Sequence, residues 1–115
     1  MNADEIQNIL AMNAEKRAQF HHQQIQKTGV VWTLVDDDGV VLLVDDELDC
    51  MPVWPDEAFV KEWINEDWAH CRAHSITIQD WQKKWIPGLA QDDLDIVVFP
   101  LQHDGGIVES PLDNN

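Results

Sequence analysis

The sequence predicts one α+β domain over residues 1–115, in which an antiparallel sheet of about four to five strands packs against helices. Three observations favour this class. The N-terminal region carries apolar side chains at helical spacing, β-branched runs separated by turn residues follow it, and a tryptophan-rich region between those runs again has helical spacing. With 115 residues, of which 44% are hydrophobic, the chain is long enough to form a single compact core.

Two consecutive helices are expected at the N-terminus, where they could form a layer of their own. Ile6, Ile9 and Leu10 follow helical spacing, which predicts a helix over residues 3–12. Asn13 is a favoured N-cap and Gly29 a favoured C-terminal stop, so the second helix is predicted over residues 14–28.

The first strands are predicted from two apolar, β-branched runs at residues 30–35 and 40–44, joined by the turn residues 36–39. Both runs are apolar at successive positions, which indicates strands that are covered on both faces. A third short strand is expected over residues 50–54. Because Pro52 cannot donate a backbone hydrogen bond, this strand is predicted at an edge of the sheet.

The second half of the chain predicts two further helices and two further strands. Pro55-Asp56-Glu57 is typical of a helix start, and Thr77 resembles the first residue of a capping box. Residues 70–76 have no clear pattern, and an extended segment is one option for them. The helix after Thr77 is expected to end at Pro87-Gly88, because proline disrupts a helix interior. Residues 96–100 and 107–109 are then predicted to be strands around the turn at 104–106.

The chain is strongly acidic, which excludes some partners but does not by itself select one. The chain has 22 acidic residues against seven Lys and Arg, a formal net charge of −15. This balance argues against binding nucleic acid or an anionic membrane, since both need basic side chains. It favours a basic protein or peptide as partner, although acidity also simply keeps a small protein soluble.

The cellular location is predicted to be cytoplasmic. The first five residues lack the basic and apolar regions of a secretory signal, and no apolar run approaches the roughly 20 residues that span a bilayer. Two isolated cysteines, Cys50 and Cys71, do not make a disulfide framework and suit a reducing compartment.

The six tryptophans divide into two groups by their position in the predicted elements. Helix or strand positions predict a core role, with nearly complete burial, for four of them: Trp32, Trp63, Trp81 and Trp85. The other two lie at element ends, where they either close the bottom of the same core or, if a ring is exposed, could anchor a partner beside basic side chains. The candidate binding residues are therefore Trp54, Trp68, Arg72 and His74.

The favoured function is a non-enzymatic protein-interaction or regulatory module. An alternative function is a metal- or small-molecule-dependent enzyme that uses His70, Cys71 and His74. Histidines at positions i and i+4 of a helix can share a metal, but an extended segment would hold them too far apart. No phosphate-binding, nucleophile-elbow or zinc-protease motif occurs in the sequence, so an enzyme is the less favoured hypothesis and no cofactor is expected. A third hypothesis is a structural homo-oligomer that pairs through the expected sheet edge near Pro52.

Several short motifs together resemble a known family. In order along the chain they are Ala14-Glu15-Lys16-Arg17, Val31-Trp32-Thr33-Leu34, Pro52-Val53-Trp54-Pro55, Trp85-Ile86-Pro87-Gly88-Leu89 and Val97-Val98-Phe99-Pro100. Over about residues 3 to 112, this pattern resembles the DUF2750 family of small bacterial proteins of unknown function. The resemblance implies no activity, ligand or catalytic residue. Trp54, Pro55, Trp85, Pro87 and Gly88 are positions of the family pattern without an assigned role.

Overall fold

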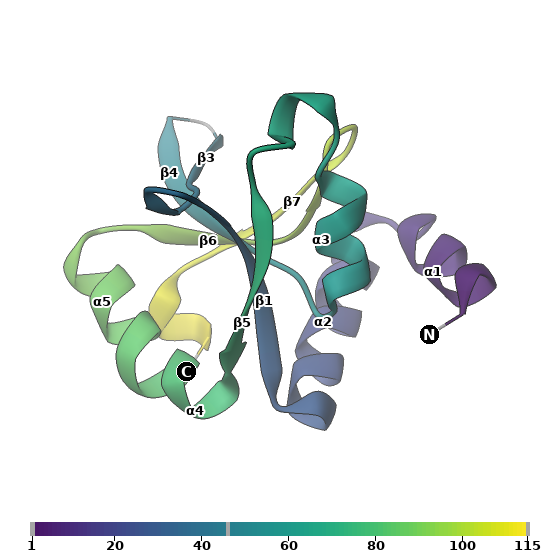
Figure 1. Cartoon of the computed structure of the whole chain (residues 1–115). Helices are drawn as coiled ribbons and strands as arrows, with labels where there is room; N and C mark the ends of the chain where they lie inside the picture. Colours follow the sequence, from purple (N-terminus) through teal and green to yellow (C-terminus); the bar gives the residue numbers. More distant parts are fainter. Residues whose placement is uncertain (1, 46, 115) are drawn as a thin grey trace.

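The structure, a computed structural model, describes residues 2–45 and 47–114 (Figure 1). Its strands form two sheets, which together with the helices confirm the predicted α+β class and the two N-terminal helices. The first sheet has the order β2 (Gly39–Val40), β1 (Val30–Asp36), β5 (Arg72–Thr77). The second has the order β3 (Leu43–Asp45), β4 (Leu48–Val53), β6 (Asp95–Leu101), β7 (Gly105–Glu109).

The helices lie on two sides of the central strands β1 and β5. In Figure 1, α1 (Ala3–Leu10), α2 (Ala14–Thr28) and α3 (Glu57–Trp63) lie on one side, whereas α4 (Ile78–Asp80) and α5 (Ile86–Gln91) lie on the other. None of the helices in the described part of the chain is both long and apolar enough to cross a membrane.

The predicted caps of α2 form as expected. The Asn13 side chain accepts a hydrogen bond from the Lys16 backbone N–H at 2.9 Å, which satisfies one of the free donors of the first turn. At the other end, Gly29 adopts a left-handed conformation with φ of 74°, and its N–H bonds the Ile25 carbonyl. These two caps explain why the predicted boundaries of this helix agree with the structure.

The second predicted apolar run does not form one strand, because its two ends join different sheets. Val40 pairs with Val35 in the first sheet, whereas Leu43 pairs with Cys50 in the second. The sheets meet again where the backbones of Trp32 and Trp54 exchange two hydrogen bonds, at 3.0 and 2.8 Å. The strands predicted for a single antiparallel sheet are therefore divided, and β4 and β6 are parallel.

The predicted edge position of Pro52 is wrong, because β4 lies between β3 and β6. Proline is tolerated there for a local reason. Residues two apart in a strand direct their backbone N–H and C=O groups to the same side of the strand. Pro52 is two residues before Trp54, so its backbone groups are directed to the side on which the Trp54 backbone bonds Trp32. On that side the β3 pairing has already ended at Cys50, and the Pro52 carbonyl accepts the Thr33 hydroxyl at 2.7 Å instead. No ladder bond needs the missing N–H.

The predicted helix end at Pro87 is also wrong. Thr77 caps the helix as expected, by accepting the Asp80 N–H, but the helical segment continues to Gln91. A π-helical turn over Trp81–Trp85 precedes the proline, and the Ile86 N–H bonds the Trp81 carbonyl five residues earlier. This wider turn relieves the conflict that a proline creates with the preceding turn.

Candidate functional site

The burial of the tryptophans agrees only in part with the expectation. Of the four rings predicted to be core, Trp81 is fully buried, whereas Trp32, Trp63 and Trp85 are only partly buried. For Trp54 and Trp68 both a rim and a core position were open. Trp54 belongs to the core, with an exposed fraction of 0%, because its backbone pairs with Trp32 of β1 and its indole N–H bonds Pro100 at the end of β6, so it offers no surface to a partner. Trp68 is partly buried.

Three tryptophans form a ladder from the core to the surface. The Trp54 indole N–H donates to the Pro100 carbonyl at 3.1 Å, which fixes the buried end. The ring of Trp63 lies 5.7 Å from that of Trp54, and Trp68 lies 5.6 Å from Trp63 in an edge-on arrangement. These distances are in the favourable range for aromatic pairs. The tryptophan ladder of Trp54, Trp63 and Trp68 therefore presents Trp68 at the surface on a rigid support.

Two hollows lie against the ladder and share one ridge. The α1–α3 hollow, of about 410 Å³, is lined by Gln7, Leu10, Ala11, Phe59, Glu62, Trp63, Asn65, Pro100, Leu101, Gln102 and His103. The β3 hollow, of about 510 Å³, is lined by Leu42, Leu43, Val44, Trp63, Trp68, Val97, Pro100, Leu101, Gln102 and Gly105. Trp63 and the Pro100-Leu101-Gln102 segment belong to both. Volumes of this size are typical of ligand pockets.

Gln102 holds the ridge to the end of α3. Its side-chain amide N–H donates to the Trp63 carbonyl, and its amide oxygen accepts from Asn65 at 2.8 Å. Asn65 in turn caps the next turn by accepting the Asp67 N–H. The indole N–H of Trp63 is different, because it is buried and has no acceptor among the residues that the structure describes. Such a group is costly unless something else supplies an acceptor.

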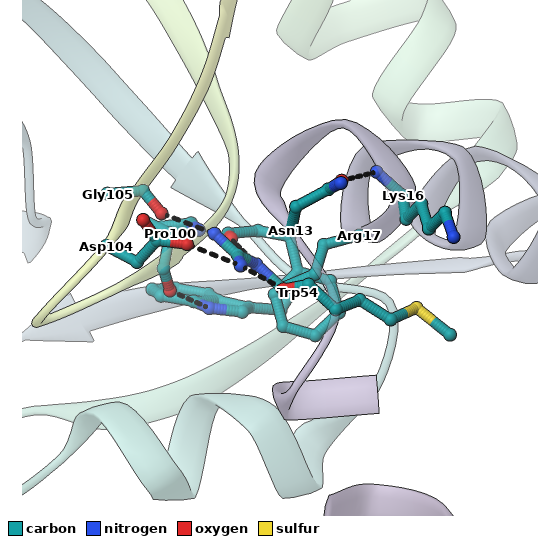
Figure 2. A network of polar contacts seen from close by, with 9 residues as sticks. Asn13, Lys16, Arg17, Trp54, Pro100, Asp104 and Gly105 are labelled. Atoms are coloured by element: carbon teal, nitrogen blue, oxygen red, sulfur yellow. Dashed lines mark hydrogen bonds and ion pairs between the residues drawn. The ribbon is translucent and has the colours of Figure 1, made fainter. Parts of the chain in front are cut away.

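Arg17 binds residues on both sides of the Pro100-Leu101-Gln102 segment in the sequence (Figure 2). This fully buried side chain donates to the Met12 carbonyl at 2.7 Å, to the Gly105 carbonyl at 2.9 Å and to the Phe99 carbonyl at 3.3 Å. It also forms an ion pair with Asp104 at 2.9 Å. Phe99 needs this support, because it adopts a positive φ of 51° that bulky residues rarely occupy. Arg17 thereby fixes the β6–β7 turn on which the ridge is built.

Comparison with known protein families gives one match. Residues 18–114 match the family model described as "Protein of unknown function (DUF2750)". The chain belongs to the DUF2750 family. The match begins later than the expected residue 3, so it contains the tryptophan motifs but not α1 or Arg17. No curated protein and no solved structure matched the chain.

The DUF2750 pattern around Trp85 forms a third hollow, the Trp85 groove. Its volume is about 330 Å³. The lining residues are mostly apolar: Val40, Leu42, Met51, Lys84, Trp85, Gly88, Leu89, Asp92 and Leu94. The π-helical turn explains why Trp85 takes part, because the added residue directs Ile86 rather than Trp85 into the core. The expected helical spacing of Trp81, Trp85 and Leu89 misses this shift.

The other candidate binding residues lie elsewhere in this DUF2750 protein. Arg72 is exposed on β5 and forms an ion pair with Asp37 at 3.0 Å, while His74 is exposed opposite Thr33. The Trp68 ring instead packs on Trp63. Arg72 and Trp68 therefore have different partners. Trp63 and Gln102 were missed because their juxtaposition depends on the tertiary fold.

The residues His70, Cys71 and His74 are poorly suited to catalysis or to metal binding. Cys71 is buried, and desolvation raises the pKa of its thiol, with a further increase from the Asp36 charge and an opposing effect from Arg72. A thiol with a raised pKa is a poor nucleophile, since the thiolate is the reactive form. In the part of the chain that the structure describes, no three His, Cys, Asp or Glu side chains are placed to hold a metal.

Proposed function

We propose that this DUF2750 protein is a non-enzymatic protein-interaction or regulatory module that binds a basic segment of a partner. One observation carries the proposal: Trp68 lies partly exposed on the rigid Trp63 ring, beside the hollows of the ladder. Tryptophan on a well-packed support is typical of the residues that dominate protein interfaces. The buried thiols of Cys50 and Cys71 suit a bacterial cytoplasm as the place of action.

The net charge of −15 supports a basic partner over a neutral or acidic one. A field of this sign speeds the encounter with a basic segment, and salt weakens it by screening. The ladder then supplies the apolar contact that charge alone does not provide. Binding should therefore depend on ionic strength and, separately, on the Trp68 ring.

The test measures binding of a short peptide of alternating lysine and valine by isothermal titration at ~50 mM and ~500 mM salt. Trp68→Ala should weaken binding at least tenfold at low salt, which corresponds to about 1.4 kcal/mol, without changing the protein's charge. Trp85→Ala is the matched control, because it removes another partly buried ring outside the ladder. Equal affinities for all three proteins would mean that only the charge binds the peptide, which contradicts the proposal.

Self-association through β3 is a second candidate function. β3 is an edge strand of its sheet, and Leu42, Val44 and Leu48 around it are exposed, Val44 by 72%. Open apolar edges can pair with another chain, although this edge is short and each copy carries a charge of −15. Light scattering at two concentrations tests it. A concentration-dependent dimer that Val44→Lys abolishes would favour this function, and a monomer at both concentrations would exclude it.

A further inference from the structure

The α1–α3 hollow combines features that suit a positively charged side chain. We infer that it receives a lysine or arginine side chain of the bound segment, with the charged group at Glu62. The inference rests on the proposed function and specifies the partner's chemistry. It adds a second contact point to the rim at Trp68, on the opposite side of the ridge formed by Trp63 and Gln102.

Glu62 supplies the charge. Among the described residues that line the hollow, Glu62 is the one acidic residue, and the only basic residue type there is His103, with no lysine or arginine. Within the described residues the structure gives Glu62 no ion pair, whereas Glu57 on the same helix binds Lys61 at 3.1 Å. A single carboxylate without a neighbouring cation selects cations over anions. One carboxylate is too few for Ca²⁺, which takes about six to eight oxygen ligands.

The walls suit the remainder of a long basic side chain. Leu10, Ala11 and Phe59 give an apolar surface on which the methylene groups of lysine or arginine can lie while the charged end stays near water. Trp63 adds an aromatic ring that attracts a cation near its face. The combination of apolar walls and one carboxylate fits a basic side chain better than a purely apolar or purely ionic ligand.

The indole N–H of Trp63 provides a reporter for occupation of the hollow. Its nitrogen is buried and lacks an acceptor among the described residues, while the Trp63 side chain lines both hollows. Because the nitrogen is not exposed, a ligand in the α1–α3 hollow changes its environment through the ring and does not bond it directly.

The test follows the indole N–H signal of Trp63 by NMR while N-acetyl-lysine methylamide is added. The Trp63→Phe variant assigns the signal among the six tryptophans. N-acetyl-norleucine methylamide is the ligand control, since it keeps the stem and backbone but lacks the ammonium group. Glu62→Gln is the test variant and Glu57→Gln the matched control, because it removes the same charge from the same helix outside the hollow.

The lysine probe should shift the Trp63 signal in the wild type and in Glu57→Gln, and should bind about two- to fivefold more weakly to Glu62→Gln, because Glu62 is exposed. Equal shifts with the norleucine probe, or equal affinity in Glu62→Gln, would overturn the inference. The proposed function is tested separately with the lysine–valine peptide. If Trp68→Ala weakens that peptide while Glu62→Gln does not, the inference fails and the proposed function stands.

Discussion

Replacing Arg17 by methionine should destabilise the protein severely. Arg17 is fully buried and donates to three backbone carbonyls, those of Met12, Phe99 and Gly105. Methionine fills much of the space but donates nothing. Apolar side chains can replace both partners of a buried ion pair without loss of stability. At Arg17 the partners are backbone carbonyls, which a substitution cannot remove, so they stay in place without a hydrogen-bond donor.

The expected loss is about 4 kcal/mol, because leaving a buried acceptor without a donor costs about 1–3 kcal/mol and two of the three carbonyls are only partly buried. The total stability of a domain is only about 5–15 kcal/mol, so the variant should lie near the limit of folding. Asp104 contributes little to this figure, because its side chain is 51% exposed and water can replace the guanidinium. Asp104→Asn should therefore cost less than about 1 kcal/mol.

Urea unfolding followed by tryptophan fluorescence measures both variants. With a slope of about 2 kcal/mol per molar urea, Arg17→Met should lower the midpoint by about 2 M, and Asp104→Asn by less than about 0.5 M. Arg17→Lys should lie between them, because an ammonium group keeps the charge but cannot reproduce the planar arrangement of donors. Equal, small shifts in Arg17→Met and Asp104→Asn would refute the reasoning that the buried carbonyls depend on Arg17.

Two further predictions concern acid and close packing. Burial, and secondarily the charge of His22, lower the pKa of His21 to about 3. Between pH ~6.5 and about 3 the His21 imidazole is therefore protonated in the unfolded chain but not in the folded protein, so the free energy of unfolding decreases as the pH falls. Between pH 7 and 5 the wild type should lose about 2 kcal/mol more than His21→Leu in urea unfolding. Gly106→Ala should cost about 3 kcal/mol in thermal unfolding, because its Cβ would lie 2.5 Å from the Val98 carbonyl oxygen. Gly88→Ala, with no neighbour within 4 Å, should instead gain about 1 kcal/mol.

Each of these predictions has a clear contrary result. The same loss on acidification in the wild type and in His21→Leu would show that other groups control the acid response. Similar melting temperatures for Gly106→Ala and Gly88→Ala would show that the β6–β7 pair can move apart to admit a methyl group.

Local signals in the sequence predicted those elements whose ends are capped by neighbouring residues. Asn13, Gly29 and Thr77 act on residues within a few positions of themselves, so the sequence contains both partners of each contact. The same holds for Asp56, whose side chain accepts the Ala58 N–H at the start of α3. The α+β class followed from these boundaries and from the β-branched runs.

The two proline predictions failed because the sequence shows what a proline lacks but not what its surroundings supply. Pro52 lies in a central strand because β3 ends before it and Thr33, 19 residues away, bonds its carbonyl. Pro87 lies within a helical segment because the preceding π-helical turn accommodates it. Both accommodations depend on backbone arrangements that local propensity does not encode.

The candidate site was only partly predictable for a related reason. Trp68 was identified from its place at an element end, but its support by Trp63 depends on how α3 meets the end of β6. Gln102 makes that junction by bonding the Trp63 carbonyl, a contact between residues 39 positions apart. The helical spacing of Trp63 on α3 therefore predicted a core residue, although its ring is only partly buried and forms part of the surface ridge.

Arg17 connects the stability of the fold to the geometry of the α1–α3 hollow. Its bond to the Met12 carbonyl fixes the joint between α1 and α2, and its bond to the Gly105 carbonyl fixes the β6–β7 turn. Those two segments bring Leu10 and Gln102 to the same hollow, although only the second lies within the family match at 18–114. Asp104→Asn keeps both carbonyl bonds, so it should bind the lysine probe like the wild type, whereas folded Arg17→Lys should bind it more weakly.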